Sequence, residues 1–320
     1  MSNITLKDDY DSLAEALGMT SDKVSEKQSG LRLPRLKIIK EGVLGQTEVK
    51  GETKSYQVVD PGSFVLEISE NDSTRKIYGK EAKIRMFMQR FKFERYVTED
   101  KKYVNSVMSA AQFTEDLPDS NGTINCGRPH RGYVDEKTYE SMSNSDQQLQ
   151  KSTRRVRVIL GLVTFSTAFN EAGEKIELDE PTPFVWDITN NTAFKVMGEI
   201  IGEMNASKIL LPRRELVFGS EQKGEGDYKT YIPKVTSKDN KDIKFKAKDQ
   251  ENLNMFLEWI KQTNTWVTNQ GGSTEENSTK TIDVKPTIEE PRKVSTKKES
   301  EPAVKEKVTK VLDEWDDDEE

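Results

Sequence analysis

Basic and aromatic side chains alternate in one stretch of the sequence, KIRMFMQRFKFERYV at residues 83–97. Read as a strand, it carries rings and positive charges on both faces, and a single bulge would regroup them. Rings stack on unpaired bases for about 1–3 kcal/mol per base, while guanidinium and ammonium groups bind phosphates. For any single ring, a place in the protein core is the alternative. As a whole, the stretch predicts contact with single-stranded nucleic acid through Arg85, Phe87, Arg90, Phe91, Lys92, Phe93, Arg95 and Tyr96.

Two further groups of arginines extend this prediction. The glycine-rich loop GRPHRGY contributes Arg128 and Arg131. The stretch STRRVRV enters a strand, and strand alternation places Arg155 and Arg157 on the same face. Solvated edge charges are the alternative interpretation of such pairs. We expect all four arginines to help bind the phosphates of the same strand.

The end of the chain has the opposite charge. The whole chain carries a net charge of −7, and residues 312–320 alone contribute −7, whereas residues 75–102 hold ten Lys or Arg against four acids. A tethered polyanion competes with phosphates for a cationic groove, and nucleic acid that displaces it makes its indole available to a partner. A solubilising end without a partner is the alternative. The expected partner-binding tail consists of Asp313, Glu314, Trp315, Asp316, Asp317, Asp318, Glu319 and Glu320.

Motifs for catalysis are absent from the sequence. It has no Gly-Lys-Ser/Thr phosphate loop, GxGxxG, GxSxG or HExxH, so we expect neither an enzyme nor a cofactor. His130 is the only histidine and follows the only cysteine, Cys126, by four residues. The pair would supply half of a zinc site, but no other half is recognisable. We therefore expect a loop cysteine, a solvent-facing histidine and no metal.

The single cysteine also excludes an intramolecular disulfide and favours a reducing compartment. No run approaches the roughly 18 apolar residues of a membrane span, and the N-terminus lacks a basic region followed by an apolar one. We expect a cytoplasmic protein that neither spans a membrane nor is secreted.

Strand-like runs separated by turn signals fill most of residues 31–248. Two amphipathic helices interrupt them, TNNTAFKVMGEIIGEMNA with Thr189 or Asn190 as its cap, and DQENLNMFLEWIKQ. In the second helix, the residues expected to face inward are Leu253, Phe256, Leu257 and Ile260. No alternation of strands and helices indicates a parallel sheet. The predicted fold class is mainly β, an antiparallel OB-like barrel or sandwich with one or two packed helices and a disordered C-terminal tail.

Four parts are expected along the chain. Residues 1–30 form an N-terminal arm with a short amphipathic helix, and residues 31–266 form the β-rich core that binds nucleic acid. Residues 267–311 form a disordered linker, because they hold almost no aromatic side chain to offset the cost in chain entropy. Residues 312–320 are the acidic tail peptide.

This organisation resembles that of phage replication single-stranded DNA-binding proteins of the OB-fold type. The resemblance covers the architecture from about residue 31 to the end, and no diagnostic motif is matched residue by residue. It implies coating of single-stranded DNA during replication, recombination and repair, in the host cytoplasm. It also implies recruitment of a polymerase, helicase or primase by the tail, and self-association into a homo-oligomer.

The chain departs from that class in two ways. Tails of the class commonly finish on an aromatic residue, whereas five acids follow Trp315. Some members carry a Cys/His zinc site, whereas this chain has Cys126 and His130 alone. A virion-assembly or scaffold-like β protein is the alternative function. It would explain the acidic tail but not the basic and aromatic residues that crowd residues 75–103.

Overall fold

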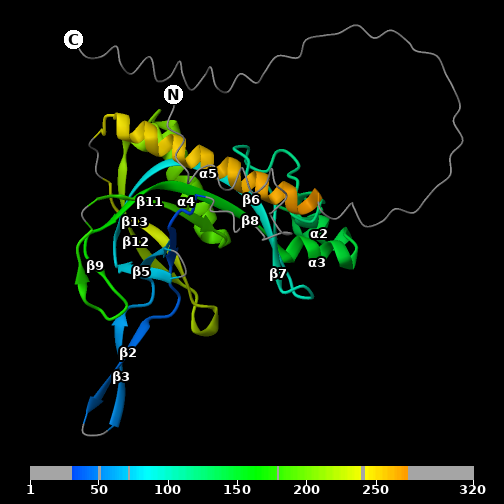
Figure 1. Cartoon of the computed structure of the whole chain (residues 1–320). Coiled ribbons are helices and arrows are strands. Elements are labelled where there is room, and N and C mark those ends of the chain that lie inside the picture. The colour runs from blue at the N-terminus through cyan, green and yellow to red at the C-terminus, as the bar shows by residue number, and fades with distance from the viewer. Residues whose placement is uncertain (1–30, 50–51, 71–72, 179, 239–241, 273–320) are drawn as a thin grey trace, which may run out of the picture. The chain divides into compact units, whose positions relative to one another are not determined.

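The computed structural model describes residues 31–49, 52–70, 73–178, 180–238 and 242–272 (Figure 1). The chain divides into two units, residues 1–277 and 278–320, and every described residue belongs to the first. The expected N-terminal arm, the acidic tail and the linker beyond residue 272 lie outside the described residues.

Strands make up most of the regular structure in the described residues. Their bounds are β1 (Arg35–Ile38), β2 (Val43–Val49), β3 (Glu52–Val59), β4 (Phe64–Glu70), β5 (Ser73–Gly79), β6 (Ala82–Val97), β7 (Lys102–Asn105), β8 (Thr153–Phe165), β9 (Ala168–Phe169), β10 (Lys175–Ile176), β11 (Thr182–Ile188), β12 (Glu215–Lys223) and β13 (Thr230–Lys238). The helices are η1 (Asn125–Gly127), α2 (Glu136–Ser141), α3 (Asn144–Ser152), α4 (Asn191–Ala206), η2 (Leu211–Arg213), η3 (Gly226–Tyr228) and α5 (Ala247–Gly272).

One large mixed sheet organises the described chain. Its strand order is β10-β9-β5-β4-β1-β11-β8-β6-β12-β13, and β7 pairs with β6 beside this path. β1 and β11 are parallel, and the other neighbours are antiparallel. β2 and β3 form a separate two-stranded ribbon that projects from the sheet (Figure 1).

The expectation of a mainly β protein is confirmed, but the expected antiparallel closed barrel is wrong. β10 and β13 stand at the two ends of the strand order and do not pair with each other, so the sheet stays open in the described chain. The parallel contact of β1 with β11 brings Arg35 beside Val185. Alternation along a strand determines its faces and says nothing about such distant neighbours.

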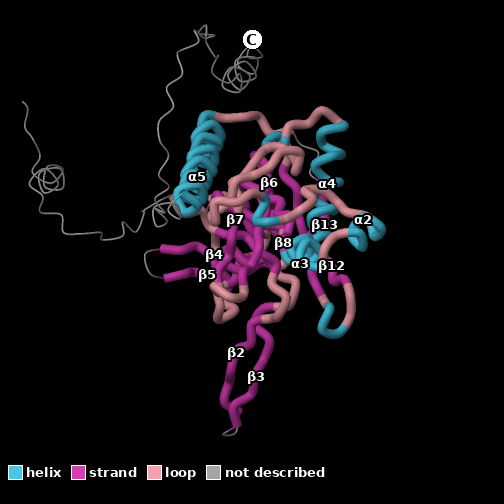
Figure 2. Tube along the Cα trace, turned by 90° about the vertical axis from the view of Figure 1, so that its right-hand side faces the viewer, coloured by secondary structure: helices cyan, strands magenta, loops and turns pink. Residues whose placement is uncertain are grey.

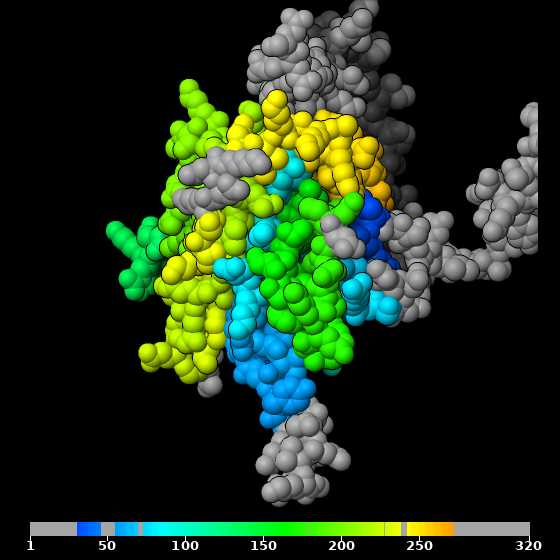
Figure 3. All heavy atoms as spheres, turned by 90° about the vertical axis from the view of Figure 1, so that its left-hand side faces the viewer, coloured from blue at the N-terminus to red at the C-terminus, as the bar shows by residue number. Residues whose placement is uncertain are grey.

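Two apolar clusters lie on opposite faces of the sheet, because successive side chains of β11 alternate between them. Trp186 packs in the cluster that contains the α4 side chains, and Val185 packs in the cluster that contains the α5 side chains. Figure 2 shows the two helices on either side of the strands. α5 also forms the upper part of the face seen in Figure 3.

Both predicted helices are confirmed. Asn190 caps α4 by accepting hydrogen bonds from the main-chain nitrogens of Thr192 and Ala193. α5 buries Phe256 and Ile260, but Leu257 is 41% exposed, so its expected inward position is wrong. The helix also continues to Gly272, past residue 266 where we expected the core to end. The sequence prediction missed α2 and α3, short polar helices with N-terminal caps.

β6 is the longest strand and changes faces in its middle. Its register against β8 shifts between Met86 and Met88, so Phe87 has no direct partner. Met86 packs in the α4-side cluster, whereas Phe87 and Met88 both pack in the α5-side cluster. After the bulge, Phe91 returns to the α4 side. This is the regrouping that a bulge was expected to cause.

Candidate nucleic-acid interface

The three phenylalanines predicted to stack on bases belong to the core, and their assignment to the interface is wrong. Phe87, Phe91 and Phe93 are 5%, 2% and 0% exposed. The Phe87 ring packs edge-on against Phe256 of α5 at 5.6 Å between centroids, and Phe93 lies 4.8 Å from Phe113. Their faces are already occupied by other rings, so a base cannot reach them.

Arg85 is also a structural residue. Its guanidinium donates to both carboxylate oxygens of Asp249 at 2.7 and 3.0 Å, and its Nε donates to the carbonyl of Pro212 at 2.6 Å. Asp249 is only 4% exposed. The pair therefore joins β6 to the start of α5, and the predicted role of Arg85 in binding phosphate is wrong.

Arg155 and Arg157 share one face of β8, as expected, but they point into the protein. Arg157 is 3% exposed, and its guanidinium lies 5.0 Å from the ring centre of Phe91 and 4.4 Å from that of Phe194. Burial lowers the pKa of Arg157 to about 10. Arg155 is half-buried at 5.9 Å from Phe113 and Phe194, and burial lowers its pKa too. The assignment of Arg157 to the interface is wrong.

The loop arginines differ from each other. Arg128 donates to the main-chain carbonyls of His130, Gln150 and Thr153, so it fastens the loop to the start of β8. Burial, assisted by the charge of Arg155, lowers the pKa of Arg128 to about 10. Arg131 lies at the surface and is partly exposed, 3.4 Å from a carboxylate oxygen of Asp116.

Cys126 and His130 occupy different environments. The thiol of Cys126 is buried and donates to the carbonyls of Phe93 and Val104, whereas His130 is exposed. Burial, and to a lesser extent the charge of Asp119, raises the pKa of Cys126. Among the described residues, no group of three or more His, Cys, Asp or Glu side chains is placed to hold a metal ion.

The end of β6 keeps four predicted residues that are not fully buried. Arg90 donates to the carbonyl of Gln89, and burial lowers its pKa. Tyr96 is 46% exposed and lies 5.0 Å from the ring of Tyr103. The other two, Lys92 and Arg95, are partly buried.

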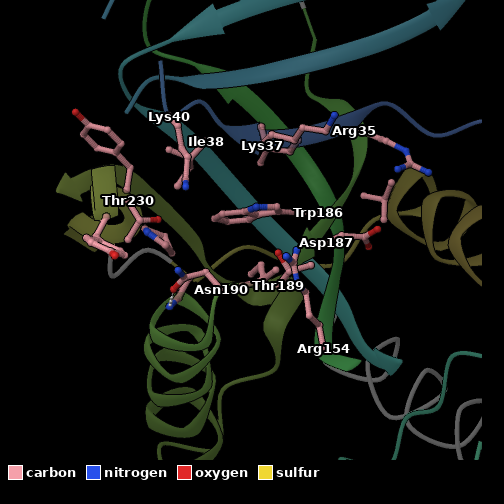
Figure 4. Close-up of a pocket in the computed structure, with 17 residues that line it drawn as sticks. Arg35, Lys37, Ile38, Lys40, Arg154, Trp186, Asp187, Thr189, Asn190 and Thr230 are labelled. Atoms are coloured by element: carbon pink, nitrogen blue, oxygen red, sulfur yellow. Dashed lines mark hydrogen bonds between the residues drawn. The ribbon is translucent and has the colours of Figure 1, made fainter. Parts of the chain in front are cut away.

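A hollow of about 660 Å³, here called hollow A, opens where β1 and β11 diverge beyond Arg35 and Val185 (Figure 4). Four basic side chains line it, and Asp187 is the acidic residue among its lining residues. The basic residues, all exposed, are Arg35, Lys37, Lys40 and Arg154. Lys37 pairs with Glu67 at 2.5 Å, whereas the other three have no carboxylate partner among the described residues.

Aromatic rings accompany these charges. Trp186 lies across the centre of hollow A in Figure 4, but it is 5% exposed and forms part of the floor. Tyr228, which is 90% exposed, and the half-buried Tyr231 stand at the β13 side. Exposed rings beside unpaired cations supply both interactions that a single strand requires.

A second hollow of about 560 Å³, hollow B, adjoins hollow A on the α5 side. The two share Arg35, Lys37, Val185, Asp187 and Thr189, and together we call them the β1–β11 groove. Hollow B adds three rings and Lys92 from the predicted set. The rings are those of Tyr103, Trp259 and Trp266, of which Tyr103 is 56% and Trp266 is 45% exposed.

The sequence analysis placed the interface on β6 and missed this groove. A local signal existed, because Arg35 and Lys37 alternate with Leu36 and Ile38, which is typical of a strand with one charged face. The remaining lining residues come from β7, β11, β13 and α5, and no local pattern brings these segments together.

Comparison of the chain with protein-family models found no match, and comparisons with curated proteins and with solved structures found no significant similarity. None of the helices in the described residues has the length and apolar composition needed to cross a bilayer.

Proposed function

We propose that the protein binds single-stranded DNA in the β1–β11 groove. The observation that supports this most is the lining of hollow A, where four exposed basic side chains stand against the single carboxylate of Asp187. Cations placed without carboxylate partners attract phosphates and release their counterions on binding. The exposed rings of Tyr228 and Trp266 provide faces for unpaired bases.

A preference for single strands follows from the rings. Base faces are stacked on each other inside a duplex, and only an unpaired base can leave that stack to lie on a protein side chain. Hollows A and B adjoin, so one strand can cross both and meet rings from η3, β7 and α5 in turn. We propose on the same basis that the protein acts in DNA replication, recombination and repair. The OB-type fold implied by the resemblance stays a prediction, and binding in the groove does not require a closed barrel.

The test is a titration of the full chain with fluorescent oligo-dT, the matching duplex and oligo-U, at several salt concentrations. Arg35→Gln with Lys40→Gln should weaken oligo-dT binding and lower the salt slope by about 0.7 for each phosphate that is no longer neutralised. Tyr228→Ala should lower affinity without changing the slope, because a tyrosine carries no charge at neutral pH.

Lys137→Gln with Lys151→Gln is the matched control. Both lysines are exposed, on α2 and α3, and neither lines the groove. The control removes the same charge from the protein and should keep the native salt slope. Equal losses of affinity in the control and the groove variant would indicate unspecific charge attraction. Equal affinity for the duplex, or no affinity for single strands, would contradict the proposal and favour a role in assembly.

A further inference from the structure

Asp187 is an unexpected residue in a groove for a polyanion, because its carboxylate repels phosphates. It lines both hollows. Its Oδ2 accepts a hydrogen bond from Nζ of Lys92 at 3.2 Å, and its Oδ1 has no hydrogen-bond partner among the described residues. A carboxylate offers about four acceptor positions, so most of the capacity of Asp187 is unused.

Lys92 brings a donor to the same place. Its Nζ lies between Oδ2 of Asp187 and Oδ1 of Asn105, which is 3.3 Å away. These three side chains line hollow B together with the rings of Trp259 and Trp266. Hollow B therefore presents an ammonium donor and a carboxylate acceptor side by side, next to aromatic surfaces. This arrangement fits the edge and the face of a nucleobase.

We infer that hollow B holds one unpaired base of the bound strand and selects guanine, an inference that rests on the proposed function. Along its pairing edge, guanine presents the acceptor O6 and then two adjacent donors, N1–H and the N2 amino group. Lys92 can donate to O6 while the two oxygens of Asp187 accept from N1 and N2. Adenine and cytosine offer one donor beside an acceptor, and thymine offers one donor between two acceptors. None of these three complements the Lys92–Asp187 pair as fully.

The experiment uses the full chain and oligonucleotides of alternating dT with dG, deoxyinosine, dA or dC, in lithium buffer to avoid guanine quadruplexes. Deoxyinosine differs from guanine only by the missing N2 amino group, so it isolates one of the two hydrogen bonds to Asp187. We expect the dG oligonucleotide to bind about fivefold or more tightly than the deoxyinosine one, the lower end for a bidentate contact to a base.

Asp187→Asn tests the residue itself. The amide keeps the shape of the side chain but replaces one acceptor by a donor, so the difference between dG and deoxyinosine should disappear. The same variant should bind oligo-dT more tightly than the native chain, because one negative charge leaves the groove.

The outcomes separate the inference from the function on which it rests. Equal binding of dG and deoxyinosine oligonucleotides by the native chain would overturn the guanine preference and leave the proposed function standing. A preference that persists in Asp187→Asn would also overturn the inference, because another residue would then read the base. Failure to bind any of the oligonucleotides would overturn both. The comparison of dG with deoxyinosine in the native chain remains decisive even if the variant does not fold.

Discussion

Arg85 of β6 and Asp249 of α5 form a bidentate ion pair where the helix packs on the sheet, with both partners largely buried. Asp249 also accepts from the main-chain nitrogen of Lys246 at 2.8 Å, just before the helix begins. The pair thus fixes where α5 starts and how it lies on β6. Because hollow B is partly lined by α5, this ion pair also positions the groove.

Removing one partner of this pair should destabilise the protein strongly. Asp249→Ala leaves the guanidinium of Arg85 buried without a counter-charge, and the free energy of unfolding should fall by about 3–5 kcal/mol. The exposed pair of Lys37 with Glu67 is the control, and Glu67→Gln should cost less than about 1 kcal/mol. Denaturant titrations of the two variants check the prediction. A decrease below about 1 kcal/mol for Asp249→Ala would show that the pair does not anchor α5.

The sequence alone predicted the strand content, both long helices and the bulge in β6, because each of these depends on local periodicity or capping. It failed for Phe91, Phe93 and Arg157, because alternation sorts side chains by face and cannot tell which faces are covered. Both faces of β6 are covered, one by residues that include Phe113 and the other by α5. A buried arginine between phenylalanine rings and an exposed one beside a base give the same sequence pattern.

Two glycines of α4 provide a test of the buried arginine. A Cβ atom at Gly198 would lie 2.8 Å from a guanidinium nitrogen of Arg157, whereas a Cβ at Gly202 would meet nothing within 4 Å. Gly202→Ala should therefore stabilise the protein by up to about 1 kcal/mol, the gain in helix propensity. Gly198→Ala should cancel that gain and destabilise further, because Arg157 is packed between two rings and cannot move freely. Thermal unfolding of both variants should give shifts of opposite sign, and an equal rise in both would contradict the packing of Arg157.

Cys126 should make stability depend on pH in the alkaline range. Burial raises the pKa of its thiol in the folded protein above the ordinary value of 9.0, so the unfolded chain releases this proton first. The resulting stability is fully present below the unfolded pKa and is lost as the pH rises from there toward the folded pKa. The free energy of unfolding should therefore begin to decline near about pH 8.5 and continue to decline above it. Denaturant titrations across this range check the prediction, and Cys126→Ser, which removes the thiol, should flatten the decline.

The buried thiol also predicts slow chemical labelling. Iodoacetamide should modify Cys126 of the native chain only through unfolding, since the thiolate is the reactive form and burial disfavours it. Rapid labelling at neutral pH without denaturant would show that the loop around Cys126 opens readily.

The acidic tail, which lies outside the described residues, leads to the last prediction. Residues 312–320 carry a charge of −7, and the cations of hollow A are the phosphate sites for which they would compete. Deleting these residues should raise affinity for oligo-dT by about threefold or more at low salt, and by less at high salt, because screening already weakens the tail. Trp315→Ala keeps all seven carboxylates and should leave DNA affinity nearly unchanged while it impairs recruitment of a partner protein. Replacing the acids by Asn and Gln should instead raise DNA affinity. Titrations at two salt concentrations check this, and identical affinities of the intact and truncated chains at low salt would mean that the tail does not compete for the groove.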